Sequence, residues 1–152
     1  MLLIQQSISQ SVEPDLVDSL LLDARERVVT LRLREAMLSI GTACEIAANI
    51  YLRRKGKDAD GQVKKLLGQR VSFAEKRFHL VTDLLDRRSL KREDPIVFDL
   101  VEKAYQARNS VAHEGRVVYK DEDSMIEIEV DAAIATRFLD AAGIAKGWLA
   151  AL

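Results

Sequence analysis

Cysteine and histidine are scarce in this chain, and their scarcity argues against two kinds of stabilising site. The one cysteine among 152 residues, Cys44, cannot form an internal disulfide. Only two histidines, His79 and His113, accompany it, so a zinc site built from cysteine and histidine is hard to assemble. We therefore expect no structural metal and no cofactor.

Long apolar runs and glycine-rich loops are also missing. No uninterrupted apolar stretch approaches the roughly 18 residues of a membrane span, and the N-terminal Met-Leu-Leu-Ile is too short and uncharged for a secretory signal. We expect a cytoplasmic protein without a membrane partner. Neither Gly-x-Gly-x-x-Gly nor a lysine-containing P-loop occurs, which argues against dinucleotide and ATP chemistry of those types.

The composition is that of a folded globular protein. Hydrophobic residues make up 48% of the chain and charged residues 31%, which fits neither a disordered tail nor a membrane protein. The length suits one hydrophobic core. We predict a single domain over residues 1–152, with residues 1–13 as an irregular N-terminal arm.

The net charge of -1 hides an uneven distribution. Residues 53–92 hold thirteen Lys or Arg against five Asp or Glu, a balance of +8, and the rest of the chain sums to -9. Such a basic segment attracts phosphate backbones, but it also occurs on helices whose charges pair with acidic neighbours or are solvated. Internal pairing or solvation is the interpretation that we favour.

Helical spacing dominates the first two thirds of the chain. Residues 15–54 contain no proline and one glycine, and the apolar spacing predicts a long helix over about 24–54, roughly 45 Å in length. Pro14 and Asp15 mark the start of this run, and Arg53 to Gly61 reads as a loop. A short helix is expected over residues 62–70.

Two further helices follow, each with a recognisable start. Ser72 and Glu75 have the spacing of a capping box, which predicts a helix ending near Arg88. After a charged linker, Asp94 and Pro95 supply an N-cap and a first helical residue, and Gly115 is the expected C-terminal stop.

The pattern then changes to alternation. Residues 117–119 and 125–130 flank a polar loop and predict a β-hairpin. Asp131 is expected to cap a last helix over residues 132–152. The apolar side of that helix would consist of Ile134, Phe138, Ala141, Ile144 and Trp148.

One segment concentrates chemically active residue types. Arg108, Asn109 and His113 stand together near the end of the helix that begins at Pro95. At about 100° per residue, Asn109 and His113 share a face, whereas Arg108 and His113 lie about 140° apart. One ideal helix cannot aim both at one point, so a bend, the reach of a long arginine or a second copy of the chain would have to bring them together.

An arginine, a polar residue, three further positions and a histidine at the end of a late helix resemble the motif of the HEPN family. The resemblance covers most of the chain loosely, and it implies an all-α, up-and-down helical bundle. The small β-hairpin between the motif helix and the C-terminal helix looks like an addition to that bundle. It also implies a metal-independent ribonuclease in which two motifs meet across a two-fold homodimer, as in toxin or defence systems.

Within that resemblance, each motif residue has a role. His113 would remove the proton of the RNA 2′-hydroxyl, because imidazole titrates near neutral pH. Arg108 would stabilise the charge that develops on the phosphate. Asn109 would orient His113 or hold the phosphate, and the partner subunit's His113 would protonate the leaving oxygen.

Besides the added hairpin, the chain departs from the family pattern in one further place. Toxin-type members often carry a tyrosine two residues after the histidine, where this chain has Gly115. A second hypothesis therefore stays open: a non-catalytic helical module in which the motif is structural and the hairpin or the basic middle binds a protein or nucleotide. In that case His113 would bond a free carbonyl at the helix end.

Other candidates have simpler interpretations. Glu45 either lines the same cleft or, as we favour, pairs with a nearby arginine. His79 lies on a basic helical face that is solvated or follows an RNA backbone. Cys44 is expected to be buried without an activating neighbour, and Phe138 and Trp148 are expected in the core.

Overall fold

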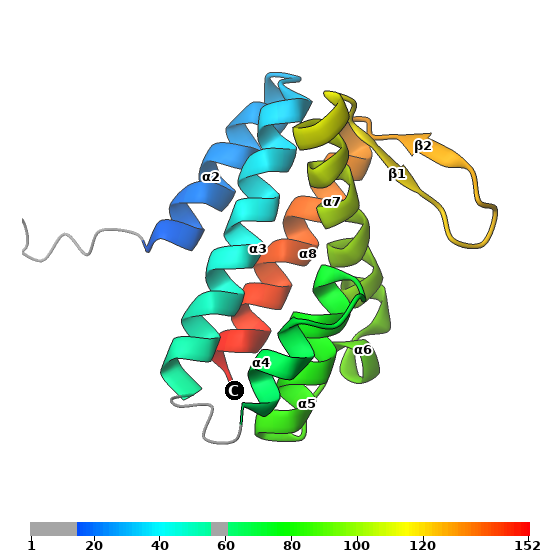
Figure 1. The fold of residues 1–152 in the computed structure, drawn as a ribbon. Coiled ribbons are helices and arrows are strands. Elements are labelled where there is room, and N and C mark those ends of the chain that lie inside the picture. The colour runs from blue at the N-terminus through cyan, green and yellow to red at the C-terminus, as the bar shows by residue number, and fades with distance from the viewer. Residues whose placement is uncertain (1–14, 56–60) are drawn as a thin grey trace, which may run out of the picture.

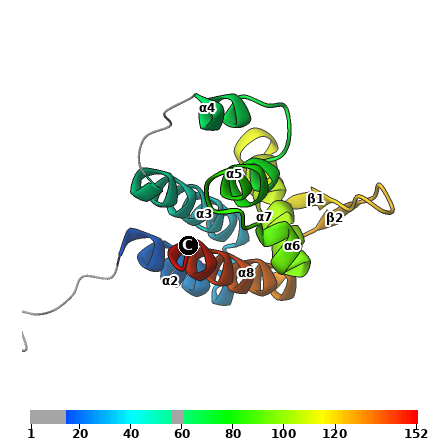
Figure 2. The ribbon, with the colours of Figure 1, turned by 90° about the horizontal axis from the view of Figure 1, so that it is seen from below.

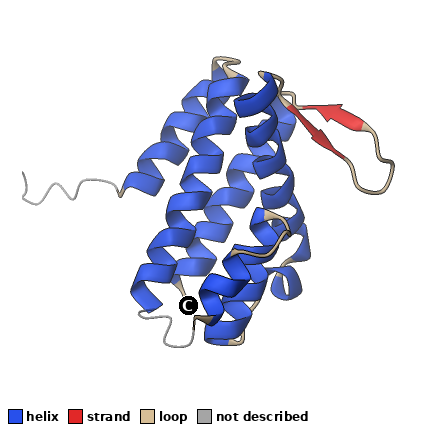
Figure 3. Cartoon of the chain, viewed as in Figure 1, coloured by secondary structure: helices blue, strands red, loops and turns tan. Residues whose placement is uncertain are grey.

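Helices make up most of the chain, as the apolar spacing predicts (Figure 3). The structure is a computed structural model that describes residues 15–55 and 61–152. Its helical elements are α2 (Leu16–Val29), α3 (Leu33–Lys55), α4 (Gln62–Leu67), the π-helical η1 (Glu75–Leu80), α5 (Val81–Asp86), α6 (Leu90–Glu93), α7 (Pro95–Glu114) and α8 (Ala132–Ala150). The predicted all-α fold with a small hairpin before the last helix is confirmed.

Four long helices form the bundle. Helix α3 packs against α2, α7 and α8, and α8 also contacts α2 and α7. Figure 2, which looks along the bundle, shows α2 and α8 on one side, α3 and α7 in the middle, and α4 and α5 on the opposite side. Helices α4 and α5 therefore cover the α3–α7 side, whereas α6 lies beside α7 and α8 (Figure 2).

The core is built largely from small and aliphatic side chains. Alanines on α3, α7 and α8 allow close helix packing, and the largest fully buried side chains include Tyr51, Phe78 and Phe138. Cys44 is buried among them, as expected. Of the apolar side predicted for α8, Phe138 and Ala141 are buried and Trp148 is partly buried, but Ile144 is 53% exposed.

The single long helix predicted over about 24–54 is wrong, because the chain turns at residues 30–32. Leu31 adopts a φ of 58°, and the Thr30 hydroxyl donates to the carbonyl of Glu26 at 3.0 Å. A side chain that bonds a backbone carbonyl competes with helix continuation. The turn folds α2 back along α3, with the Arg27 guanidinium donating to Ser39 Oγ at 3.3 Å between them.

The predicted helix starts are present at atomic detail. Asp15, Asp94 and Asp131 each accept a hydrogen bond from the backbone N–H three residues further on, and Ser72 Oγ accepts one from Glu75 N at 3.1 Å. Gly115 ends α7 with a φ of 68°, a conformation that costs glycine little. These caps fix where the motif helix begins and ends.

Several element boundaries differ from the predictions. Helix α4 ends at Leu67 rather than residue 70, and α5 ends before Arg87, which has a φ of 58°. The expected charged linker contains α6. The loop predicted to start at Arg53 does not do so, since α3 continues to Lys55; residues 56–60, like the predicted N-terminal arm, lie outside the described residues.

The hairpin is formed by β1 (Val118–Lys120), shifted by one residue from the prediction, and β2 (Glu127–Glu129), which is shorter than expected. Tyr119 lies opposite Ile128 in antiparallel register. Its base is attached to the bundle. The Tyr119 ring meets Phe138 of α8 edge to face, with centroids 5.7 Å apart, and Lys120 N donates to the Gln106 side chain at 3.4 Å. The rest of the hairpin projects outward (Figure 1).

Glu102 of α7 has a carboxyl group whose shifted pKa makes the stability of the fold depend on pH. Burial raises the pKa of its carboxyl group above 4.5, although hydrogen bonds with Ser72, Gln106 and the backbone of Ala74 lower it. A raised pKa means that the folded state holds the proton more tightly, so stability is lost as pH rises through this range. We expect the free energy of unfolding of Glu102→Gln, measured relative to that of the wild type, to be larger at about pH 7 than at about pH 4. Urea unfolding at both pH values measures this difference, and a pH-independent difference would contradict the prediction.

No helix within residues 15–55 and 61–152 combines the length and the apolar character that crossing a membrane requires.

Candidate functional site

Arg108 is held on the side of α7 that faces α3. Its guanidinium donates from Nη1 to Asn109 Oδ1 at 3.0 Å and from Nη2 to Glu45 Oε2 at 3.5 Å, and its side chain is 25% exposed. The Nε atom is buried and has no hydrogen-bond partner among the described residues. Glu45 thus pairs with an arginine, as we favoured, and the pair occupies the centre of the site.

Aromatic rings support this ion pair from one side. Tyr105 donates a short hydrogen bond to Glu45 Oε1, and its ring stacks on Phe73 with centroids 4.0 Å apart. The Arg108 guanidinium lies 5.4 Å from the centroid of the Tyr105 ring. Burial and the hydrogen bond to Glu45 raise the pKa of Tyr105 to about 12, so the phenol remains a donor at neutral pH.

Gly41 allows α3 to approach the stem of Arg108. A Cβ atom at this position would lie 2.5 Å from Arg108 Cγ and 2.9 Å from its Cβ, both far inside normal contact. No other residue type fits here without moving one of the two helices. The close approach therefore fixes how Arg108 leaves α7.

His113 lies one turn beyond Asn109 and is exposed. Among the described residues its ring has no hydrogen bond or ion pair. It lines an open groove of about 320 Å³ between α7 and the hairpin, together with Asn109, Ser110, Tyr119 and Lys120. The expectation that a structural His113 would bond a carbonyl at the helix end does not describe this side chain.

The two charged members of the motif occupy adjacent surfaces of α7. Arg108 faces Glu45 on α3, whereas His113 faces the groove beside the hairpin, in keeping with the angle of about 140° between their positions on an ideal helix. Asn109 connects the two surfaces, because it accepts from Arg108 and also lines the groove with His113. The helix does not bend to bring Arg108 and His113 together.

Sequence reasoning missed three contributors to this site. Tyr105 stands three residues before Arg108 on the same face of the helix, but nothing in the local sequence marks it as part of the site. Phe73 comes from the segment before η1, and no local pattern connects it with α7. The lone glycine in the run of residues 15–54 was the one available signal for a close helix approach at Gly41.

His79 does not lie on a solvated face as we expected. Its Nδ1 atom is 2.7 Å from the hydroxyl of the buried Ser89, and its Nε2 atom is 3.8 Å from Glu75. Cys44 is buried, and burial together with the nearby charge of Glu45 raises the pKa of its thiol to about 12. Neither side chain is available as a nucleophile or base.

Much of the basic middle is paired internally. Ion pairs join Lys55 to Asp86, Lys91 to Glu75 and Arg92 to Asp83. Arg88 pairs with Glu93, and Arg54 donates to the last carbonyls of α8. The internal pairing that we favoured therefore accounts for these cations.

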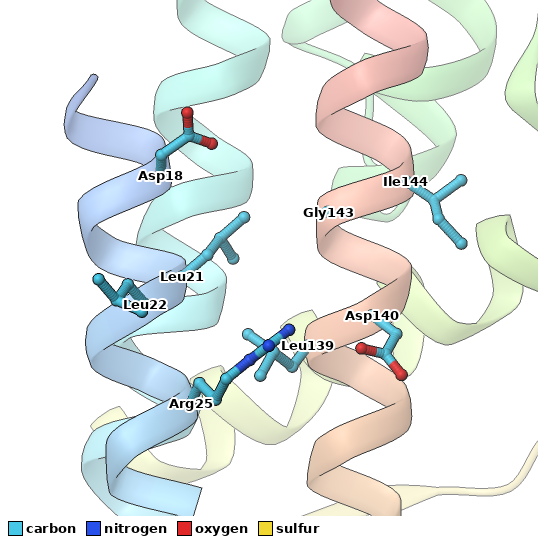
Figure 4. Close-up of a pocket in the computed structure, with 8 residues that line it drawn as sticks. All are labelled: Asp18, Leu21, Leu22, Arg25, Leu139, Asp140, Gly143 and Ile144. Carbon is cyan, nitrogen blue, oxygen red and sulfur yellow. The ribbon is translucent and has the colours of Figure 1, made fainter. Parts of the chain in front are cut away.

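A larger groove than the one beside His113 lies elsewhere. It measures about 490 Å³ between α2 and α8, and its lining includes Leu21, Leu22, Arg25, Asp140 and Ile144. Figure 4 shows Leu22 and Ile144 pointing away from each other on the two helices, whereas Leu21 and Arg25 point from α2 toward α8. The groove holds none of the motif residues.

Within residues 15–55 and 61–152, no three His, Cys, Asp or Glu side chains gather in a way that could hold a metal ion.

Comparison of the chain with family models, curated proteins and solved structures finds no match. The resemblance to HEPN proteins therefore rests on the motif and the helical architecture.

Proposed function

We propose that the protein is a HEPN-like endoribonuclease that cleaves RNA without a metal, at a cleft formed by two copies of the chain. One observation carries the proposal: an exposed histidine, which has no hydrogen bond or ion pair among the described residues, follows an asparagine that accepts a hydrogen bond from an arginine. His113, Asn109 and Arg108 supply a base, a polar link and a cation within two helical turns. Attack of an RNA 2′-hydroxyl on the neighbouring phosphate needs a base to remove the hydroxyl proton and a cation to stabilise the charge that develops on the phosphate.

His113 is the base in this proposal. Its ring faces open solvent in the groove, so an RNA 2′-hydroxyl can approach it, and neutral imidazole accepts a proton near neutral pH. The leaving 5′-oxygen needs a proton donor. The partner subunit's His113 takes that role, which is the reason for proposing a two-fold homodimer.

Arg108 stabilises the phosphate charge in competition with Glu45. Its hydrogen bond to Glu45 is long at 3.5 Å, and its buried Nε–H has no hydrogen-bond partner within residues 15–55 and 61–152. An unsatisfied buried donor costs about 1–3 kcal/mol, so a phosphate oxygen that reached it would recover that free energy. Asn109 and the Tyr105 ring keep the guanidinium in place meanwhile.

The experiment is incubation of the purified protein with mixed RNA in the presence of excess chelator. We expect cleavage that persists with chelator and products that end in a 2′,3′-cyclic phosphate, because the attacking group is the RNA's own hydroxyl. Absence of cleavage at every pH tested, or cleavage abolished by chelator, would rule out the proposed chemistry.

A specific observation also favours the second candidate, a non-catalytic binding module. Arg108 is largely buried and already paired with Glu45, as a structural arginine would be. In this alternative the groove lined by His113 binds a nucleotide or a protein segment without reaction. Binding of RNA with no cleavage, weakened in the His113→Ala variant, would support it.

A further inference from the structure

The hairpin, residues 117–130, carries an exposed apolar tip on an acidic stem. Met125 and Ile126 are 64% and 61% exposed. The segment contains five acidic residues and one lysine, a balance of -4. Glu122, Asp123 and Glu129 are exposed and have no ion pair within the described residues. Two adjacent large apolar side chains among unpaired carboxylates are typical of a contact surface rather than of a solvated turn.

The conformation of the tip supports the same interpretation. Met125 has a φ of 58°, a left-handed conformation that a bulky side chain rarely adopts, and its N–H donates to the carbonyl of Asp121 at 2.8 Å. The strained turn presents Met125 to solvent. The hairpin is anchored through Tyr119 on Phe138, through Lys120 N on Gln106 and through the ion pair of Asp121 with Lys103 at 4.0 Å, and a two-stranded hairpin alone is marginally stable in water. A binding partner would stabilise the outer part.

A surface of opposite charge lies at the end of α4. Lys65 and Arg70 are exposed and have no ion pair among the described residues, and Val71 beside them is 42% exposed. We call Lys65, Arg70 and Val71 the α4 patch. Its mixture of cations and an exposed aliphatic side chain complements the acidic, apolar hairpin.

We propose that the hairpin of one copy of this chain docks on the α4 patch of a second copy, and that the contact is reciprocal. The carboxylates of Glu122 and Asp123 meet Lys65 and Arg70, and the apolar tip covers Val71. The strand β1 at the base of the hairpin is also a wall of the groove that contains His113. A copy held by the hairpin therefore lies beside that groove, but the contact itself does not depend on the proposed RNA cleavage.

Charge reversal on each side tests the contact. The hairpin variant is Glu122→Lys with Asp123→Lys, and the patch variant is Lys65→Glu with Arg70→Glu. By sedimentation velocity we expect the wild type to dimerise and each variant alone to associate about tenfold or more weakly, because like charges then face each other. An equimolar mixture of the two variants restores the dimer, since both reciprocal contacts become complementary. The control, Glu26→Lys with Asp140→Lys, makes the same change in net charge at exposed positions on α2 and α8 and leaves dimerisation unchanged.

The result that overturns the proposal is a wild type that stays monomeric, or a dimer that neither variant weakens. A patch variant that loses RNA binding while its association is unchanged also overturns it, because the α4 patch would then be an RNA surface. Sedimentation velocity measures the association of the chains and does not depend on RNA cleavage. A wild type that dimerises as expected but does not cleave RNA would contradict the proposed nuclease and leave the hairpin contact standing.

Discussion

Replacing His113 with alanine is expected to reduce RNA cleavage by about 10²–10⁴-fold, the usual contribution of a general base or acid. Because the ring is exposed and has no hydrogen bond within the described residues, its removal should leave the free energy of unfolding nearly unchanged. The measurement is the initial rate of cleavage of a labelled RNA, taken together with thermal unfolding of both proteins. Loss of activity without loss of stability identifies a chemical role.

Arg137→Ala is the matched control for the His113 variant. Arg137 is an exposed cation on α8 without an ion pair in the described part of the chain, so its loss changes surface charge without touching the groove. We expect this control to retain nearly full activity. Equal cleavage rates for wild type and His113→Ala would remove His113 from the mechanism. A parallel loss in both variants would point to general electrostatic attraction of RNA.

Gly41→Ala is expected to destabilise the protein and to remove RNA cleavage at the same time. The added methyl group would lie 2.5 Å from Arg108 Cγ, an atom close to the backbone of α7 that cannot swing away alone. Overpacking of this kind costs about 1–3 kcal/mol, and the better helix propensity of alanine offsets roughly 1 kcal/mol of that. The displaced Arg108 would lose its contacts with Glu45 and Asn109. Urea unfolding and the cleavage rate measure the two effects.

Gly147→Ala is the control for Gly41→Ala, because the same substitution is expected to stabilise the protein at this position. Gly147 lies within α8, and a Cβ atom there would meet nothing within 4 Å. We expect this variant to gain about 0.5–1 kcal/mol of stability from helix propensity and to cleave RNA like the wild type. If Gly41→Ala were also stabilising, Arg108 would have room to move, and the close approach of α3 would not define its position.

The sequence allowed correct prediction of those features of the fold that depend on near neighbours along the chain. The caps at Asp15, Asp94 and Asp131 need only a side chain and a backbone N–H three residues later, and the stop at Gly115 needs only a residue that tolerates positive φ. The turn at Leu31 was missed, because neither glycine nor proline marks it and it is stabilised by packing of α2 along α3.

The candidate site likewise has features that the sequence predicts and features that depend on contacts between distant segments. The sequence by itself determined that Arg108, Asn109 and His113 stand near the end of one helix, and that Asn109 and His113 share a face, since helical periodicity sets both. Only the tertiary structure decided that Arg108 meets Glu45 and Tyr105 while His113 stays open to solvent beside the hairpin. Those contacts join residues about sixty positions apart, and helix packing around Gly41, which no local pattern specifies, brings them together.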